Sequence, residues 1–139
     1  MFRIRLADWD KDEGTLRAVR HAVFVIEQRV PVQIEWDGID ADCCHAIAED
    51  AAGNAIGCAR LLPDGHIGRL AVLAAWRGRE VGGALLEWLI ALARERGHRR
   101  VVLNAQTHAL AFYERHGFAP VGDPFVEAAI AHQPMQRVL

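Results

Sequence analysis

The sequence predicts an α/β (α+β) domain with a mixed central sheet of about six or seven strands and helices on both faces. Two observations support this prediction. Several short stretches are apolar or alternate apolar with polar residues, as strands do, whereas two longer stretches repeat their apolar residues every three or four positions, as amphipathic helices do. Helical stretches also lie between the strands, which is typical of a sheet covered on both sides.

The amino-terminal part is predicted to contain a strand, a helical region and a loop. Residues 1–6 alternate apolar and basic side chains, which indicates a half-buried strand. An amphipathic helix or helix pair follows, with Asp10 or Asp12 as its cap and Pro31 as its end. Its apolar face is predicted to carry Leu16, Val19, Val23, Ile26 and Val30. Residues 33–44 are acidic and aperiodic, so we expect an exposed loop of the kind that often determines specificity.

The rest of the chain continues to alternate strands and helices. Three apolar stretches separated by turn residues predict an antiparallel meander at residues 45–49, 55–62 and 67–73. A second amphipathic helix begins near Val81 and is ended by Gly97. A strand, a short helix and two closing strands are then predicted at residues 100–104, 107–116, 118–121 and 129–138.

Composition limits the kinds of partner. A length of 139 residues with 52% hydrophobic content fits one domain over residues 1–139. The 16 basic and 18 acidic residues give a net charge of -2, which provides no excess positive charge for nucleic acid or an anionic membrane. Three cysteines, two of them adjacent, indicate no disulfide framework, and no signal peptide or membrane-spanning stretch is expected. We therefore expect a cytoplasmic protein.

The start of the second amphipathic helix has the features of an anion site. A helix amino terminus offers free N–H groups and about half a positive charge. Gly78, Gly82 and Gly83 let backbone approach a phosphate closely, and Arg77 and Arg79 add charged donors. The alternative is that the glycines allow helix packing and the arginines are solvated. Basic residues oppose the helix dipole at this end, which favours a bound pyrophosphate.

Two motifs resemble the GNAT superfamily of acetyl-CoA-dependent N-acetyltransferases. Residues 68–72 and 77–86 are similar to the acetyl-CoA segment of that family, and residues 109–118 match its A-x-x-F-Y-x-x-x-G-F pattern at every specified position. Similarity over nearly the whole chain looks like the ElaA-like branch of small bacterial GNAT proteins. The resemblance implies a GNAT fold and transfer of an acetyl group from acetyl-CoA to a primary amine.

The acetyl-CoA segment departs from the family pattern Q/R-x-x-G-x-G/A at one position. Aligned from Arg77, Gly82 takes the last small position and Glu80 replaces the middle glycine. Aligned from Arg79, Gly82 and Ala84 both match, but only the first register keeps the usual helix length. The glutamate therefore bears on one backbone contact to the pyrophosphate.

The resemblance also implies which residues bind acetyl-CoA. Backbone groups of the strand before the helix are expected to pair with the pantetheine arm, and two amide side chains on the next strand could bind the cofactor. The expected cofactor-binding residues are Leu70, Ala71, Val72, Arg77, Gly78, Arg79, Val81, Gly82, Gly83, Asn104, Gln106 and Phe112.

The chemistry of amine acetylation indicates further candidates. In the family the tyrosine of the second motif lies near the CoA sulfur, so Tyr113 is expected to protonate the departing thiolate; the alternative is a tyrosine that packs on the core. An amine with a pKa near ~10.4 must lose a proton, for which Glu27, His45 and His132 are candidates. Each could instead be an ordinary surface or strand residue. We expect no metal, because the contiguous residues 43–45 cannot converge on one ion.

The acceptor and the assembly are left open by the sequence. The acidic loop at residues 33–44 could attract a cationic amine or could simply be a solvated turn. A small amine and a protein amine are both compatible with the motifs, and so is a homodimer. The rival function is a catalytically silent acyl-CoA-binding sensor or interaction module, which would keep the cofactor groove without an acceptor.

Overall fold

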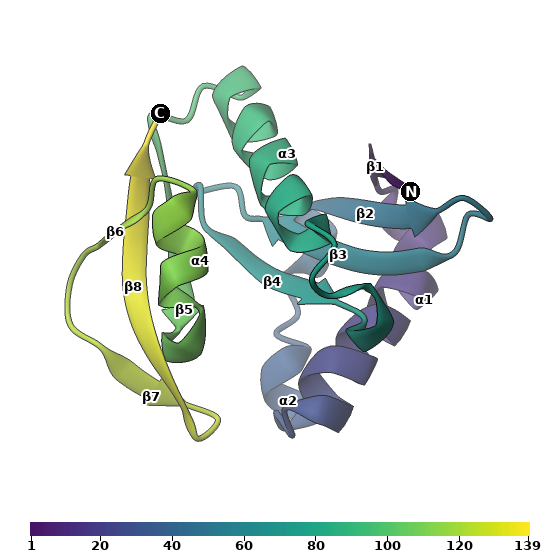
Figure 1. Cartoon of the computed structure of the whole chain (residues 1–139), viewed down its shortest axis with the longest axis horizontal. Coiled ribbons are helices and arrows are strands. Elements are labelled where there is room, and N and C mark those ends of the chain that lie inside the picture. Colours follow the sequence, from purple (N-terminus) through teal and green to yellow (C-terminus); the bar gives the residue numbers. More distant parts are fainter.

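The computed structural model describes residues 1–139 and contains two antiparallel sheets (Figure 1). The first has the order β1-β2-β3-β4, formed by Phe2–Leu6, Cys44–Asp50, Ala55–Leu61 and Ile67–Val72. The second has the order β5-β8-β6, with β7 also paired to β8, formed by Arg100–Gln106, Ile130–Val138, Ala119–Pro120 and Phe125–Glu127. The meander β2–β4 agrees with the sequence prediction.

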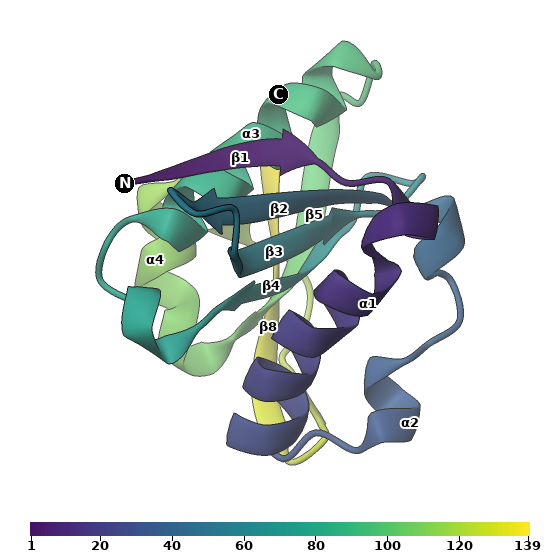
Figure 2. The same cartoon turned by 90° about the vertical axis from the view of Figure 1, so that its right-hand side faces the viewer.

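Helices cover both faces of the first sheet, as expected for this fold class (Figure 2). Helices α1 and α2 lie on one face and α3 on the other, and α4 lies beside β5. The four α-helices are Trp9–Arg20, Val32–Glu35, Val81–Glu95 and Leu110–Arg115. A π-helical segment, His21–Glu27, continues α1, and three short 3-10 turns are Asp40–Asp42, Ala74–Trp76 and Thr107–Ala109. None of the helices is long and apolar enough to cross a bilayer.

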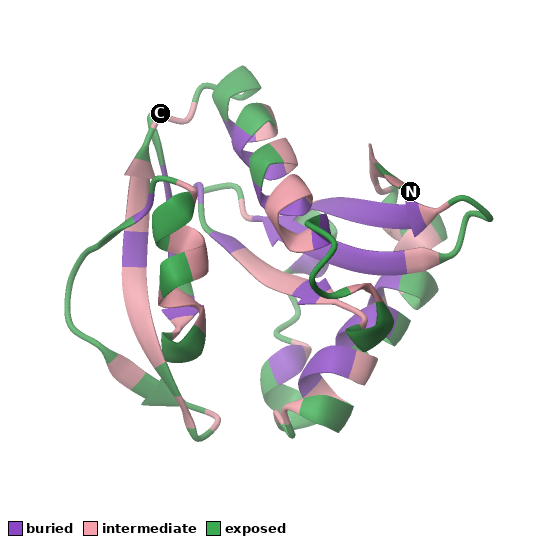
Figure 3. Cartoon of the chain, in the orientation of Figure 1, coloured by how far each residue is buried: buried purple, intermediate pink, exposed green.

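The core forms two layers, one on each side of β2, β3 and β4; in Figure 3, β2 and β3 are purple (buried) over most of their length, whereas β4 is mostly pink (intermediate). Because side chains alternate along a strand, Ile47, Cys58 and Ala71 pack under α1, while their neighbours pack under α3. The α3 layer also includes Val101 and Met135, so the two sheets share this part of the core.

A single backbone bridge joins the two sheets. His66 and Val102 form an isolated parallel bridge, and the Val102 N–H donates to the Gly65 carbonyl at 3.2 Å. Beyond this bridge, β4 pairs only with β3, and β5 pairs only with β8. The edges of β4 and β5 that face each other therefore form no further backbone hydrogen bonds. The parallel pairing makes the arrangement mixed, as predicted, and the divergence opens the molecule between β4 and β5 (Figure 1).

Several local predictions were wrong. Helix α1 is capped by Asp8, whose Oδ1 accepts from the Asp10 N–H at 3.0 Å, rather than by Asp10 or Asp12. Ile26 is 64% exposed because the π-helical segment changes the number of residues per turn and rotates it away from the core. Leu6 is exposed where the chain leaves the sheet. The predicted strand at 118–121 contains only two paired residues, and β7 was not predicted.

Candidate active site

A cleft of about 630 Å³ lies where β4 and β5 diverge. We call its two sides the α3 wall and the α1 wall. The α3 wall contains Gly82, Asn104, Gln106, Phe112 and Tyr113. The α1 wall contains Phe24, Glu27, Ile34, Glu35, Arg60 and Arg69. Leu70, Val72, Arg77 and His132 also line the cleft, so it brings together residues from both sequence motifs.

A recess at the start of α3 lies beside the same cleft. Val72, Arg77, Gly82 and Phe112 line both spaces, so the two are adjacent. The recess is also lined by the predicted residues Gly78, Val81 and Gly83. No side chain caps the first turn of α3, so its N–H groups are free for a ligand.

The charged groups of this recess differ from those predicted. Arg79 does not line it, because its guanidinium lies over the Trp76 ring at 5.0 Å from the ring centre. Arg115 and His116, which the sequence did not single out, do line it. They lie at the end of the short helix α4 and reach the recess through packing between α4 and α3. A Cβ on Gly83 would lie 3.0 Å from His116 Nε2, so only glycine fits there without displacement.

The backbone at Glu80 explains the departure from the family pattern. Glu80 has φ 67° and takes the left-handed conformation just before α3 begins. Glycine adopts this conformation at little cost, whereas other L-residues are strained in it. The glutamate therefore preserves the geometry of a glycine position in the register that starts at Arg77.

Two polar pairs cross the cleft between its walls. Arg77 donates to both Glu27 carboxylate oxygens at 2.8 Å and to the Val72 carbonyl at 3.0 Å. The hydrogen bonds from Arg77 lower the pKa of Glu27. Gln106 Nε2 donates to Gln28 Oε1 at 2.8 Å. Arg77, Glu27 and Gln106 thus all lie at the site, but each is already engaged with another side chain.

Tyr113 stands on α4 among aromatic neighbours. Its ring meets Phe112 and Phe118 edge to face, at centroid distances of 5.0 and 6.0 Å. Burial raises the pKa of Tyr113 to about 12. The hydroxyl therefore keeps its proton at neutral pH and can act as a donor.

The two candidate histidines occupy different environments. His132 lines the cleft, stacks on Phe125 at 5.2 Å, and has Nδ1 2.8 Å from the Ile130 carbonyl. A carbonyl only accepts, so Nδ1 carries the proton and Nε2 of the neutral ring keeps a free lone pair. His45 is 2% exposed and does not line the cleft. It bonds to the Asp40 carbonyl at 2.8 Å, and burial lowers its pKa.

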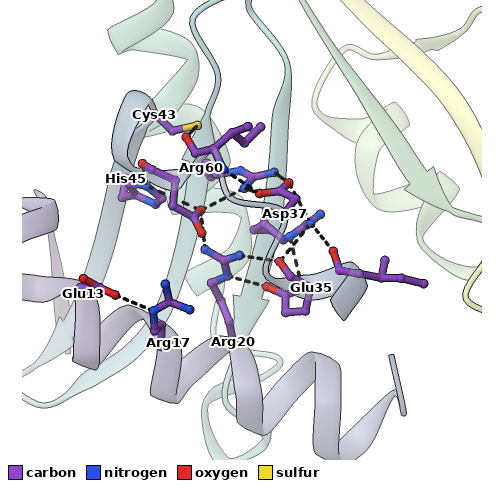
Figure 4. Close-up of polar contacts among 12 residues, drawn as sticks. Glu13, Arg17, Arg20, Glu35, Asp37, Cys43, His45 and Arg60 are labelled. Atoms are coloured by element: carbon purple, nitrogen blue, oxygen red, sulfur yellow. Dashed lines mark hydrogen bonds and ion pairs between the residues drawn. The ribbon is translucent and has the colours of Figure 1, made fainter. Parts of the chain in front are cut away.

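Six charged side chains form a cluster in and behind the α1 wall (Figure 4), which we call the arginine cluster; four of them are buried, whereas Arg69 and Asp37 are partly exposed. Its members are Arg20, Arg60, Arg69, Glu35, Asp37 and Asp40. Arg20 contacts Glu35 at 2.6 Å and Asp40 at 2.7 Å. Arg60 bonds to Asp37 and Asp40 at 2.9 Å.

The arginine cluster corrects the prediction for residues 33–44. Most of this segment is exposed, as expected, but it contains the end of α2 and a 3-10 turn, and Glu35 and Asp40 are only 2% and 4% exposed. Burial opposes ionisation, yet hydrogen bonds from Arg20 and Arg60 hold the pKa of Asp40 below its usual value. Burial raises the pKa of Glu35 against the nearby charges of Arg69 and Arg20. Three of the four acidic residues of this segment, Glu35, Asp37 and Asp40, therefore bind arginines of the same chain.

No group of three or more His, Cys, Asp or Glu side chains is arranged to hold a metal ion. Cys43 and Cys44 are half-buried, and Cys58 is fully buried on the α1 side of the sheet. Burial raises the pKa of Cys58 to about 12. This thiol therefore stays protonated.

Comparison with known proteins identifies the family to which this cleft belongs. Residues 15–139 match the family described as the acetyltransferase (GNAT) domain. The chain is a GNAT acetyltransferase. The matched residues include both motifs and the residues that line the cleft. Membership of this family identifies the chain as an acyltransferase.

GNAT relatives support the ElaA-like branch as well. The chain is 34% identical to protein ElaA of Escherichia coli over 130 residues, covering 88% of this chain and 84% of ElaA. It is also 34% identical to the uncharacterized N-acetyltransferase YjcF of Bacillus subtilis over 123 residues, which is 86% of this chain and 87% of YjcF.

Solved GNAT structures have the same fold. An acyl-CoA N-acyltransferase from Pseudomonas aeruginosa superposes with a TM-score of 0.88 at 32% identity, over 99% of this chain and 100% of that one. ElaA of E. coli gives 0.85 at 31% identity, with 99% of each chain covered. A GNAT acetyltransferase from Elizabethkingia anophelis with acetyl-CoA bound gives 0.74 at 17% identity over 99% and 98% of the chains, a likeness of fold alone.

Proposed function

We propose that this GNAT protein transfers the acetyl group of acetyl-CoA directly to a primary amine, with Tyr113 as general acid and His132 as general base. The observation that carries this proposal is that the cleft between β4 and β5 and the recess at the uncapped start of α3 are adjacent and share four lining residues. An extended thioester can lie along the first while its pyrophosphate reaches the second.

The cofactor part of the proposal depends on backbone groups. The edge of β4 that pairs with no other strand, at Leu70–Val72, can hydrogen-bond to the amides of a pantetheine arm. The free N–H groups of the first turn of α3 suit a pyrophosphate, and Arg77 and Arg115 add charge. Asn104 and Gln106 supply amide side chains on the opposite strand.

The chemical step needs one proton donor and one proton acceptor. The amine nitrogen attacks the thioester carbonyl carbon, the carbon–sulfur bond breaks, and sulfur takes a proton from Tyr113. The amine gives up its own proton to a base. His132 suits that role because it lines the cleft and its Nε2 has no hydrogen-bond partner in the protein, whereas Glu27 is bound to Arg77 and His45 lies outside the cleft.

Two measurements test this function in sequence. Calorimetric titration with acetyl-CoA, with CoA and NAD as comparisons, is expected to show binding of the two CoA compounds only. Release of free CoA in the presence of amines is then expected for at least one acceptor. Binding without release for any amine would favour the silent acyl-CoA sensor, and no binding of either CoA compound would refute the proposal.

A further inference from the structure

The guanidinium of Arg69, in the arginine cluster, is left partly without partners at the cleft. Its Nη2 donates to the Ile34 and Glu35 carbonyls and to Asp37 Oδ2, all at 3.2 Å. Its Nε lies 3.3 Å from Glu35 Oε1 without forming a hydrogen bond. Nη1 bonds to nothing in the protein, and its two N–H groups are therefore available to a ligand.

The backbone fixes this side chain at the cleft. Arg69 has φ 51°, a left-handed conformation that costs a residue other than glycine about 1–2 kcal/mol. It lies on β4 where the pairing with β3 shifts its register. Strain of this kind concentrates at functional positions. Arg69 also directly precedes Leu70–Val72, the strand edge that we expect to hold the thioester end of the cofactor.

The two carboxylates near Arg69, those of Glu35 and Asp37, are each shared with another arginine. The arginine cluster contains three arginines and three carboxylates, and each carboxylate is already in contact with at least one arginine. Glu27 is taken by Arg77. Burial lowers the pKa of Arg69, which is the signature of a cation that its surroundings compensate only in part. The remaining carboxylate that lines the cleft is Glu127, exposed on β7.

We infer that Arg69 binds a carboxylate of the acceptor, so that the substrate class is a small amino-carboxylate rather than a polyamine or an amino sugar. This inference rests on the proposed function. A guanidinium with two free N–H groups matches the two oxygens of one carboxylate. Glu127 lies on the same cleft and complements the ammonium end of such an acceptor. The cleft must also admit the thioester, which favours a small acceptor.

Matched pairs of amines test this specificity in the wild-type protein. Phenylalanine, phenylalaninamide and phenethylamine differ in the carboxylate, as do lysine and cadaverine. We expect kcat/KM for CoA release to be at least about tenfold higher for the carboxylate-bearing member, as for a charged hydrogen bond. Equal rates, or a preference for the decarboxylated member, would overturn the inference.

Variants then assign the preference to Arg69. Arg69→Gln is expected to remove the preference while the calorimetric affinity for acetyl-CoA stays unchanged, and Arg69→Lys is expected to restore part of it. Arg29→Gln is the matched control, because Arg29 is another left-handed arginine, with φ 59°, that does not line the cleft. Arg69 would have a structural role instead if the preference for the carboxylate survived in Arg69→Gln. The same would follow if kcat/KM fell equally for both amines of a matched pair.

A binding measurement separates this inference from the proposed function. The CoA-saturated and the free protein are titrated calorimetrically with phenylalanine and with phenethylamine, which requires no turnover. Tighter binding of phenylalanine that is lost in Arg69→Gln supports the carboxylate site even if no acetyl group is transferred. Binding of acetyl-CoA together with indifference to the carboxylate would refute the site and leave the acetyltransferase intact.

Discussion

The α3 wall of the cleft offers backbone edges and an uncapped helix start, whereas most charged side chains of the α1 wall are already bound to one another. On the first side, the groups available to a ligand are peptide N–H and carbonyl groups, aromatic rings and glycines. On the second, the arginine cluster links α1, α2, the 3-10 turn, β3 and β4. Under the proposed function, the first wall would bind acetyl-CoA and the second would fix the shape that selects the acceptor.

The largest expected effect comes from breaking the arginine cluster. Arg20→Met should lower the free energy of unfolding by about 3–5 kcal/mol, because it leaves Glu35 and Asp40 buried without their main partner. Urea denaturation measures this loss. Arg17→Met is the control on the same helix: Arg17 and Glu13 are 40% and 45% exposed, so loss of their ion pair should cost at most about 1 kcal/mol, and loss of the Arg17 contacts with Trp9 and Trp36 should add about 0.5–1 kcal/mol. Similar losses in both variants would contradict the structural role of the cluster.

The next effect tests the chemistry of the α3 wall. Tyr113→Phe should lower kcat by about a hundredfold or more, with the affinity for acetyl-CoA unchanged, because only the proton donor is removed. In the wild type, a pKa of about 12 means that Tyr113 keeps its proton until the pH approaches that value. The tyrosine should therefore cause no fall in kcat as the pH rises through the neutral range. An unchanged kcat in the variant would remove Tyr113 from this role.

A comparison of two histidines tests the base. His132→Gln should lower kcat/KM by about a hundredfold at neutral pH, and the deficit should shrink as the pH approaches the amine pKa of about 10.4. His45→Gln should instead lower stability and leave the shape of the pH profile unchanged, because His45 is buried outside the cleft. A pH-independent deficit in His132→Gln would point to a packing role against Phe125.

A smaller effect is expected where the α3 wall is strained. Glu80→Gly should raise the free energy of unfolding by about 0.5–1 kcal/mol, because glycine relieves the left-handed backbone but gains more entropy on unfolding. Glu114→Gly, in the regular helix α4, should lower it by about 1 kcal/mol. Thermal and urea denaturation distinguish the two signs. Destabilisation in both variants would show that Glu80 contributes a stabilising contact.

The smallest effect concerns the ion pair between Glu27 and Arg77, which crosses the cleft. Glu27→Gln should tighten acetyl-CoA binding by about twofold to fivefold, since it releases Arg77 from an exposed ion pair worth about 0.2–1 kcal/mol. Calorimetric titration at low salt measures the change. Weaker binding in the variant would mean that Glu27 positions Arg77 for the ligand rather than competing with it.

The sequence predicted the α3 wall better than the α1 wall for a physical reason. Gly82, Gly83 and Tyr113 belong to contiguous motifs, because a helix start and a strand edge are built from neighbouring residues. Arg79 was predicted to contact the pyrophosphate, because the sequence does not reveal that its guanidinium stacks on Trp76.

The arginine cluster had no such local signal. Arg20 pairs with carboxylates 15 and 20 residues away, and Arg60 pairs with Asp37 across 23 residues. The aperiodic acidic segment looked solvated because the sequence does not show that arginines on α1, β3 and β4 face it. The one available signal was the presence of arginines, above all Arg20 and Arg60, in segments predicted to be buried. A buried arginine needs an acidic partner, which those acids supply.

The single bridge between His66 and Val102 has a consequence for cooperativity. The two sheets share a core under α3, but their backbones are joined at one point only. A ligand that hydrogen-bonds to the free edges of both β4 and β5 takes the place of a strand between them. It would connect the hydrogen bonds of the two sheets into one continuous set. Such a ligand stabilises the native state by mass action and also makes the two halves open together. Under the proposed binding mode, the sheet of this protein would be complete only when acetyl-CoA is bound.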